Sequence, residues 1–286
     1  MRKIAAVEEM RAAAGETKRG GQTIGFVPTM GYLHEGHLSL IKKSQRSAHT
    51  TVVSIFVNPL QFGPQEDFRR YPRDPDRDEA LLEKAGVDIL FCPGDLDMYP
   101  EGFRTTVEVA GLQDKLCGRS RPGHFKGVAT VVLKLFNIVR PDYAFFGQKD
   151  AQQAIILKRM AEDLNLEAKI EVLPTIRERD GLAISSRNTY LSPEERRSAT
   201  VLFRSLEEAR QMFAGGERRA GPIRELMLRT ISSEPLAKVD YVEIVDLRTI
   251  KPVDRIEGDA LVAMAVFIGA TRLIDNTIFE GKREQP

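Results

Sequence analysis

Cysteine and tryptophan are scarce in this chain, and it has neither a long apolar run nor an excess of charge. Its 286 residues include two cysteines, Cys92 and Cys117, and no tryptophan. Two cysteines cannot form a disulfide framework, and such sparse use is typical of reduced thiols in a cytosolic protein. The longest apolar stretch, 260–270, is far shorter than the ~20 residues of a membrane helix, so we expect a buried strand there. The N-terminal segment has acidic residues where a secretory signal needs its apolar core.

Charge is almost balanced, with 42 Lys and Arg against 41 Asp and Glu, a net charge of +1. Proteins that bind nucleic acid through general electrostatic attraction normally carry a basic excess or stripe, so this class is disfavoured, although a local basic pocket remains open. The composition therefore indicates a soluble, cytoplasmic, globular protein, either an enzyme or a small-molecule binder. The length suits one large domain or two of ordinary size.

Strand-like apolar runs alternate with helical patterns through the first two thirds of the chain. The expected strands are 23–27, 51–57, 87–91, 143–146 and 169–173, and the expected helices are 37–48, 76–85, 126–139 and 151–164. This alternation predicts parallel βαβ units in a doubly wound α/β sheet. Ligands of such sheets bind at the carboxyl ends of the strands, which directs attention to the segments after positions 27, 57, 146 and 173.

The last third has a different pattern. Ser192-Pro193-Glu194-Glu195 is a capping box with proline at the first helical position, so a helix should run from there to about Phe213. A second helix is expected at 222–232, followed by strands near 239–245, 261–268 and 272–279. Helices followed by strands predict a smaller α+β domain, and we divide the chain into domains 1–184 and 185–286.

The segment from Pro28 to His37 follows the first strong strand and opens a helix. Its unpaired N–H groups and positive dipole end suit a phosphate, and Gly31 and Gly36 allow the backbone to approach a ligand closely. His34 and His37 are three residues apart, so both could point at one anion. A metal pair and an inert loop are the alternatives, and a metal site would need further ligands that this segment lacks.

Neutral polar residues follow the second buried strand. Asn58 taken alone would be a turn residue, but Asn58 together with Gln61 suits recognition of substrate hydroxyl and carboxylate groups. The stretch 63–76 is rich in proline and charge. It is predicted to be a long loop, either a lid over the site or a plain solvated loop.

Two later segments carry possible phosphate ligands. Gly147-Gln148-Lys149-Asp150 follows a strand and opens a helix, and Lys149 could place its charge on a phosphate. Ser185, Ser186 and Arg187 form a phosphate clamp by residue type. A surface lysine and a serine-rich linker are the respective alternatives.

Taken together, these segments resemble a known family. PTMGYLHEGHLSL is similar to the His-x-Gly-His signature of nucleotidyltransferases, and 184–187 resembles their second signature, which is related to the KMSKS loop of class I aminoacyl-tRNA synthetases. FVNPLQF, YPRDPDRD, RPGHFKGVATVVLKLFNIVRPDYAFFGQKDAQQ and DGLAISSRNTYLS occur in the same chain. With these motifs the chain resembles the pantothenate synthetase family from about 23 to 192, and beyond that in length and layout.

The resemblance implies a fold and a reaction. The expected fold is a Rossmann-like N-terminal domain with a smaller C-terminal domain that covers the ATP site. The expected reaction condenses (R)-pantoate with β-alanine at the expense of ATP, through a pantoyl adenylate, and gives pantothenate, AMP and pyrophosphate for coenzyme A biosynthesis. Mg²⁺ is expected with ATP, with no protein ligand assigned. The resemblance also implies a homodimer whose other partners are small molecules, without nucleic acid or membrane.

The resemblance also assigns roles to individual residues. His37 is the expected proton donor, with His34 and Lys149 as the other catalytic residues. Gln61 is expected to bind both pantoate and β-alanine, Gln153 to bind pantoate, and Asn58 to support them. The expected ATP-binding residues are Met30, Gly31, Tyr32, Leu33, His34, Glu35, Gly36, His37, Gly147, Gln148, Lys149, Asp150, Ile176, Ile184, Ser185, Ser186 and Arg187.

Two positions depart from the family pattern, and two other functions stay open. Cys117 stands where many relatives would have an acid, and Gln148 where glutamate is common, but neither position has an assigned chemical role. The alternatives are a nucleotidyltransferase for another small acid or phosphate ester, and a non-catalytic ATP sensor. Because its overall charge is balanced, the chain should concentrate positive potential at His34, His37, Lys149, Arg187 and a helix N-terminus.

Overall fold

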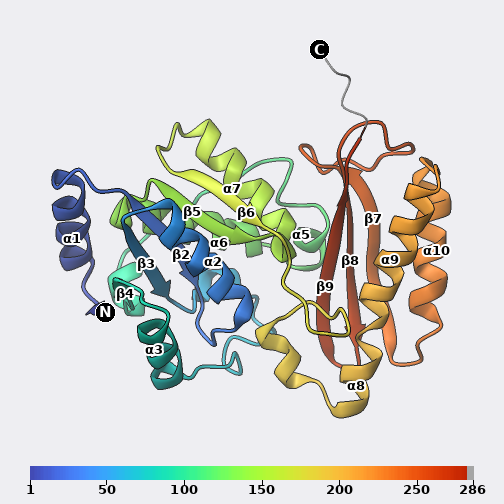
Figure 1. Cartoon of the computed structure of the whole chain (residues 1–286), viewed down its shortest axis with the longest axis horizontal. Coiled ribbons are helices and arrows are strands. Elements are labelled where there is room, and N and C mark those ends of the chain that lie inside the picture. Colours follow the sequence, from blue (N-terminus) through green and yellow to red (C-terminus); the bar gives the residue numbers. More distant parts are fainter. Residues whose placement is uncertain (282–286) are drawn as a thin grey trace.

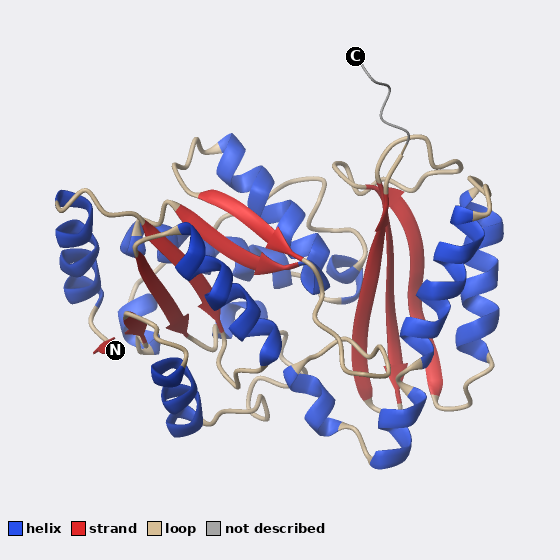
Figure 2. Ribbon diagram, viewed as in Figure 1, coloured by secondary structure: helices blue, strands red, loops and turns tan. Residues whose placement is uncertain are grey.

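The computed structural model of the chain describes residues 1–281 and contains two β-sheets that stand side by side (Figures 1 and 2). The larger is a six-stranded parallel sheet in the order β1-β4-β3-β2-β5-β6, and the smaller is an antiparallel sheet in the order β7-β8-β9. This arrangement confirms the predicted fold class. The strands are β1 (Arg2–Ile4), β2 (Ile24–Thr29), β3 (Thr50–Ile55), β4 (Ile89–Phe91), β5 (Tyr143–Gly147), β6 (Lys169–Leu173), β7 (Ala237–Asp246), β8 (Ala260–Ile268) and β9 (Thr271–Phe279).

Helices cover both faces of the larger sheet and one face of the smaller. Helices α1, α6 and α7 share one hydrophobic core with the larger sheet, and α2 packs on its opposite face beside α3. Helices α9 and α10 pack on β7 to β9 (Figure 1). The helices are α1 (Val7–Arg19), α2 (Glu35–Ser47), α3 (Pro75–Lys84), α4 (Asp95–Met98), α5 (Cys117–Ser120), α6 (His124–Val139), α7 (Ala151–Asp163), α8 (Pro193–Ser198), α9 (Val201–Ala214) and α10 (Ala220–Ser232), with 3₁₀ turns η1 (Pro59–Gln61), η2 (Gln148–Asp150) and η3 (Ser186–Tyr190). None of the helices within residues 1–281 combines the length and the apolar character that crossing a bilayer requires.

The central strands are apolar on both faces because each face meets a layer of helices. In β2, Phe26 belongs to the core with α1 and α6, whereas Val27 belongs to the core with α2 and α3. Val52 and Val53 divide in the same way in β3. Successive side chains of a strand point to opposite faces, so a parallel strand between two helical layers is a continuous apolar run. The sequence shows this run clearly, which is why these strands were predictable.

Strands β2 and β5 separate at their carboxyl ends. They are paired only at Gly25–Tyr143 and Phe26–Ala144, although both strands continue further. Pro28 lies in the part of β2 that pairs with β3 but not with β5, and it has no N–H to donate to a ladder. The connection from β2 leads to β3 on one side of the sheet, whereas the chain returns to β5 on the other. This is the switch point of the strand order, where open α/β sheets bind their ligands.

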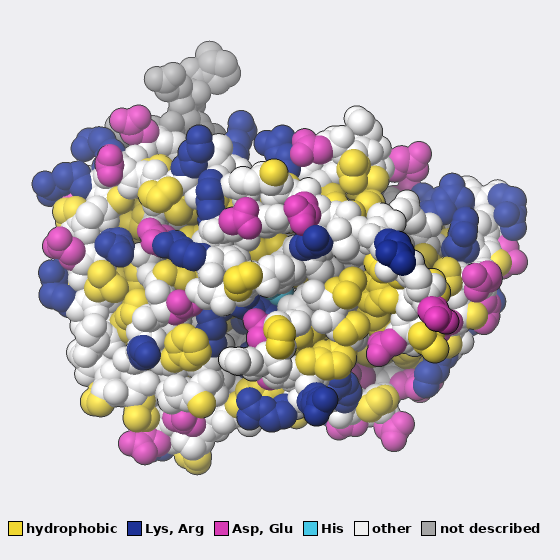
Figure 3. All heavy atoms as spheres, turned by 180° about the vertical axis from the view of Figure 1, so that it is seen from behind, with side chains coloured by type: hydrophobic (Ala, Val, Ile, Leu, Met, Phe, Trp, Pro, Cys, Tyr) yellow, Lys and Arg dark blue, Asp and Glu magenta, His cyan; other side chains and the backbone are white. Residues whose placement is uncertain are grey.

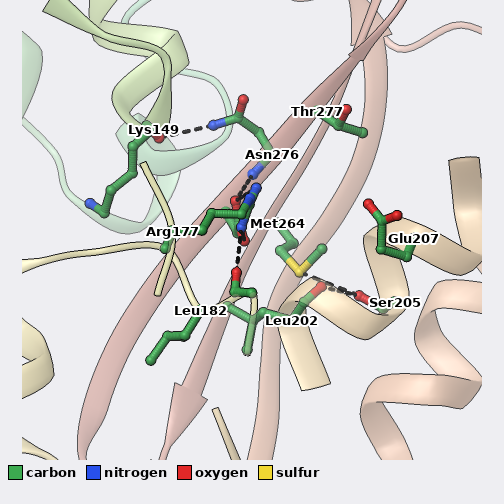
Figure 4. A network of polar contacts seen from close by, with 12 residues as sticks. Lys149, Arg177, Leu182, Leu202, Ser205, Glu207, Met264, Asn276 and Thr277 are labelled. Carbon is green, nitrogen blue, oxygen red and sulfur yellow. Dashed lines mark hydrogen bonds and ion pairs between the residues drawn. The ribbon is translucent and has the colours of Figure 1, made fainter. Parts of the chain in front are cut away.

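The smaller sheet is bonded to the loop that follows β5. The side-chain amide of Asn276 on β9 donates to the backbone carbonyls of Gln148 and Lys149, each at 2.9 Å (Figure 4). Arg177 forms a two-bond ion pair with Asp275 of the same strand, at 2.6 and 2.9 Å. These bonds join the two layers directly beside the carboxyl ends of β5 and β6. The domain division at 184/185 remains a prediction.

The expectation of a single helix from Pro193 to about Phe213 is wrong. The capping box and the proline start a helix as predicted, but α8 ends at Ser198 and α9 begins at Val201. The Thr200 N–H donates to the carbonyl of Arg197, three residues back, which tightens the turn and breaks the α-helical ladder. Strand β1 and helix α1 were also absent from the expected elements, because their buried side chains are small or few.

Gly127 in α6 provides a test of how closely this helix must approach η1. A Cβ at Gly127 would lie 2.2 Å from the carbonyl oxygen of Leu60, a backbone atom that cannot rotate away. Gly127→Ala should therefore lower the free energy of unfolding by about 1–3 kcal/mol, measured by urea denaturation. Gly221 in α10 has no atom within 4 Å of a built Cβ, so Gly221→Ala is the control and should be neutral or stabilising by up to about 1 kcal/mol. Equal losses in both variants would contradict this account.

Candidate active site

A polar cleft lies at the carboxyl ends of β2 and β5. It consists of a cavity of about 230 Å³ above the strand ends and an adjoining one of about 660 Å³ that reaches the smaller sheet. Figure 3 shows histidine atoms at the bottom of a hollow on one face, with basic and acidic side chains around it. The predicted site residues that line the smaller cavity are Met30, His34, Gly36, His37, Asn58, Gln61, Gly147, Lys149, Asp150, Gln153, Ile176, Ile184, Ser185, Ser186 and Arg187.

The other predicted ATP-binding residues do not line this cavity: Gly31, Tyr32, Leu33, Glu35 and Gln148. The first three form a turn that Asp78 holds in place. Sequence reasoning overlooked Asp78. The buried Asp78 carboxylate accepts the N–H of Tyr32 at 2.6 Å and that of Leu33 at 2.8 Å. Gly31 has a φ of +82°, and a Cβ there would come within 3.1 Å of Asp78. These residues therefore set the position at which α2 begins.

His34 and His37 present matching donors to the cavity. The Nδ1 of His37 accepts the N–H of His34 at 3.3 Å, and the Nδ1 of His34 accepts the N–H of Gly36 at 3.2 Å. A neutral imidazole whose Nδ1 accepts must carry its proton on Nε2. The two ring centres are 4.1 Å apart. The start of α2 thus fixes two neighbouring Nε2–H groups as hydrogen-bond donors.

Both histidines are neutral in the folded chain. Burial, reinforced by the nearby Lys149 charge, lowers the pKa of His34 to about 4. Burial also lowers the pKa of His37 well below its usual range, and His34 and Lys149 add to this effect. Any positive potential at this turn therefore comes from polar N–H groups and not from imidazolium charge. Burial is the main reason that the two imidazoles stay neutral, and the charge of Lys149 adds to it.

The cleft's lysine and arginine are placed differently. The side chain of Lys149 is 20% exposed, its Nζ is 3.8 Å from Asp150, and it extends away from the smaller sheet (Figure 4). Arg187 is instead bound to Asp67, with Nε and Nη2 donating at 2.9 and 3.0 Å. Ser185 accepts the backbone N–H of Arg187 at 3.3 Å. The guanidinium of the predicted clamp is therefore occupied by a carboxylate of the chain itself, and the clamp remains a prediction.

Gln61 and Asn58 are linked in a buried hydrogen-bond chain. Tyr99 donates its hydroxyl to the Oδ1 of Asn58 at 2.7 Å, and the Nδ2 of Asn58 donates to the Oε1 of Gln61 at 3.0 Å. The Nε2 of Gln61 then faces the sulfur of Met30 at 3.0 Å. Asn58 and Tyr99 thereby fix which end of the Gln61 amide faces the cavity, as a donor. Gln153 lines both cavities from the first turn of α7.

His124 and Arg121 are cleft residues that sequence reasoning missed. The Nδ1–H of His124 donates to the carbonyl of Gln61 at 2.8 Å, and Arg121 Nη1 lies 3.1 Å from the Nε2 of His124. Burial, together with the Arg121 charge, lowers the pKa of His124 to about 4. The spacing of His124 from the other histidines did not suggest a shared site, so it gave no reason to select this residue. The RPGHF run that includes both residues was the available clue.

The loop 63–76 runs along the rim of this cleft. Glu66 pairs with Arg121 and Asp67 pairs with Arg187, so two adjacent carboxylates bind two arginines of the cleft. Tyr71 of the same loop is buried and lines the smaller cavity. These contacts argue against a plain solvated loop. That the loop acts as a lid over the site remains a prediction.

The fold and the cleft define a class: α/β proteins that hold polar and basic groups at the switch point of a parallel sheet. Comparison with known proteins gives the family. The family model described as Pantoate-beta-alanine ligase matches residues 2–278. The chain therefore belongs to the pantoate-beta-alanine ligase family, whose members are the pantothenate synthetases, as its motifs suggested.

Individual relatives agree over almost the whole chain. A pantothenate synthetase of Pelotomaculum thermopropionicum is 58% identical over 95% of this chain and 96% of the relative. A crystal structure of the enzyme from Thermus thermophilus has a TM-score of 0.93 at 47% identity, covering 97% of this chain and 99% of that one. The Francisella tularensis pantoate-beta-alanine ligase, complexed with beta-gamma ATP and beta-alanine, has a TM-score of 0.80 at 33% identity and covers 97% of each chain.

The lowered histidine pKa values predict how stability depends on pH. The unfolded chain takes up protons at His34 and His124 near pH 6.5, whereas the folded chain does so only near pH 4. Stability from these groups is complete above about pH 6.5 and is lost as the pH falls. The free energy of unfolding should therefore decrease between pH 7 and pH 5 in urea denaturation. His124→Gln should make this dependence shallower, and an unchanged slope would contradict the assignment.

Proposed function

We propose that this chain is an ATP-dependent pantoate–β-alanine ligase and that the polar cleft is its active site. Family membership supports the ligase activity over transfer of a nucleotide to another small acid. One observation supports the location above all: the paired Nε2–H donors of His34 and His37 and the amine of Lys149 line one cavity at the switch point of the sheet. An activated phosphate and a carboxylate are the groups that such a site suits.

The first step attaches AMP to the pantoate carboxylate. A carboxylate is a poor electrophile because its leaving group would be oxide, so the oxygen attacks the α-phosphorus of ATP and pyrophosphate leaves. Two anions must approach each other, and negative charge grows on the phosphoryl oxygens in the transition state. We assign the His37 and His34 donors to those oxygens, with Lys149 as the adjacent point charge. Neutral histidines can donate there without losing a proton, which is why their low pKa is no obstacle.

The second step forms the amide. The neutral amine of β-alanine attacks the adenylate carbonyl, and AMP leaves with its bridging oxygen. We assign Gln61 to both pantoate and β-alanine and Gln153 to pantoate, because both side chains line the cavity beside the histidines. Water would hydrolyse the adenylate, so the site must exclude it. The smaller sheet, bonded through Asn276 to the loop that carries Lys149, is placed to cover one side.

We propose that Mg²⁺ accompanies ATP. An ATP-using ligase requires a divalent metal in general, and the metal would neutralise charge on the leaving pyrophosphate. The cleft fits this role through Asp150, whose half-exposed carboxylate lines both cavities beside Lys149. Magnesium usually takes one or two carboxylates and completes its shell with phosphate and water oxygens. A single cleft carboxylate is therefore a sufficient protein ligand.

Location, assembly and domain roles are also part of this proposal. The protein acts in the cytoplasm, for which the sparse cysteines are the support, and it forms a homodimer, which rests on its resemblance to the family. Residues 1–184 carry the reaction, and 185–286 form the domain that covers it. Its partners are ATP, pantoate and β-alanine rather than nucleic acid, in keeping with the net charge of +1.

Replacing His37 tests the adenylation step. His37→Ala removes one N–H donor to the phosphoryl group, so kcat/KM for AMP formation should fall by about 10²-fold or more. His49 is the matched control, because it contacts Thr23 at the amino end of the sheet, away from the cleft. His49→Ala should leave kcat/KM within about twofold. An unchanged rate in His37→Ala would end its assigned role.

Replacing Gln61 tests the assignment of the two acceptor substrates. Gln61→Ala should raise KM for pantoate and for β-alanine by about tenfold or more, since each would lose a hydrogen bond inside a desolvated cavity, and KM for ATP should change little. Amide formation is followed together with AMP release, omitting each substrate in turn. A defect confined to ATP would show that Gln61 is misplaced. A nucleotidyltransferase would leave AMP attached to the acid, so pyrophosphate release by the unmodified chain without free AMP or amide product would favour that alternative.

A further inference from the structure

Asp67 binds Arg187 as a substrate anion would. Nε and Nη2 of the guanidinium donate in parallel to the two carboxylate oxygens at 2.9 and 3.0 Å. This forked geometry is the one that arginine also uses for phosphate. The Tyr190 hydroxyl donates to the same carboxylate at 3.3 Å, and the ring of Tyr71 lies 5.8 Å from the guanidinium carbon. One forked edge of the Arg187 guanidinium is therefore already occupied by a carboxylate.

The pair stands where the two cavities meet. Arg187 lines both of them, and Asp67 lines the larger one. The side chains are only 28% and 14% exposed. Although burial alone would raise the pKa of Asp67, its bonds to Arg187 lower it, so the carboxylate is ionised at neutral pH. Any ligand that spans the cleft would meet this ion pair.

The loop that carries Asp67 is attached at a second point. Its neighbour Glu66 accepts from Nε and Nη2 of Arg121 at 2.7 and 2.6 Å. The Glu66 N–H bonds to the carbonyl of Gly63, and the Arg70 N–H to that of Asp67, so the loop has internal turns rather than a fixed strand or helix. Ion pairs thus hold residues 66 and 67, whereas Tyr71 further along the loop is buried. Release of one ion pair therefore need not disturb the sheets or the buried part of the loop.

We propose that Asp67 is a placeholder for the substrate triphosphate: it holds Arg187 until a phosphate group displaces it and takes its position. The proposal rests on the proposed function, which assigns Arg187 to ATP. Leaving a half-buried guanidinium without a partner would be costly, and exchange of one anion for another avoids that state. A polyphosphate can complete the exchange, whereas an uncharged nucleoside cannot. Asp67 thereby weakens binding of ATP but makes it depend on the phosphates.

Asp67→Asn tests this exchange. Loss of the competing charge should tighten binding of Mg·ATP by about three- to tenfold and lower KM for ATP with little change in kcat, since the pair is partly exposed and modest in strength. Binding is measured by titration calorimetry and KM by AMP formation. In an Arg187→Gln background the same substitution should give no gain, because the effect acts through Arg187.

Two further variants distinguish the placeholder role of Asp67 from a general effect of net charge and from an effect of misfolding. Glu207→Gln changes the net charge equally but breaks a pair with Arg210 on α9, remote from the cleft, and should leave ATP binding unchanged. Tyr190→Phe removes the hydroxyl that contacts Asp67 at 3.3 Å and the carbonyl of Arg70 at 3.0 Å, without changing charge, and should tighten ATP binding by up to about twofold. If Asp67→Asn does not fold, Tyr190→Phe still tests the proposal.

The outcomes distinguish the two proposals. Weaker ATP binding in Asp67→Asn would show that Asp67 positions Arg187 for ATP, which would overturn the placeholder while the ligase function stands. An equal gain in the Arg187→Gln background would overturn it as well. If the unmodified chain neither binds Mg·ATP nor releases AMP with both other substrates, the proposed function itself fails and the placeholder fails with it.

Discussion

The candidate site depends on the point where hydrogen bonding between β2 and β5 stops. Pairing ends at Phe26 and Ala144, and both strands then run on without each other. The resulting gap lies at the switch point of the sheet, and the loops after β2 and β5 bring the His34–His37 turn and Lys149 to one cavity. Pro28, which pairs with Ser54 of β3, has no N–H with which to extend the ladder toward β5.

Within the cleft, little positive charge is left without a neutralising partner from the same chain. The histidines stay unprotonated because burial disfavours their charged forms, and Arg121 and Arg187 are paired with carboxylates of one loop. Each of the two guanidinium groups therefore has a partner before any substrate binds, so neither is left as a largely buried, unpaired charge. These pairs also explain how a chain with a net charge of +1 can handle a highly anionic substrate. Positive potential becomes available when a stronger anion displaces the chain's own acids.

The smaller sheet bounds one side of the site and supplies none of the proposed catalytic residues. Asn276 holds the backbone of the β5 loop, and the Arg177–Asp275 pair joins the segment after β6 to the same strand. These contacts are backbone-directed or fully paired, so they fix position without placing a free charge in the cleft. The cleft therefore has rigid walls from two sheets and a rim formed by a loop that ion pairs attach. Movement is easiest where attachment is ionic, because an ion pair can exchange partners and a packed core cannot.

Local patterns predicted five of the six parallel strands and their alternation with helices, because a strand buried on two faces is a continuous apolar run; β1, with one buried residue, was missed. Residue type and motif order were enough to select most of the residues that line the cleft. The division of one expected helix into α8 and α9 was not predictable, since a tightened turn depends on what packs around it. His124 and Asp78 were missed because their roles are to hold Gln61 and the α2 turn, partners 63 and 45 residues away. By itself, the sequence determined the fold class and the residue types available at the site. Only the tertiary structure decided their state: which histidines are neutral, and that Arg187 already binds Asp67, because both follow from burial and from contacts between distant segments.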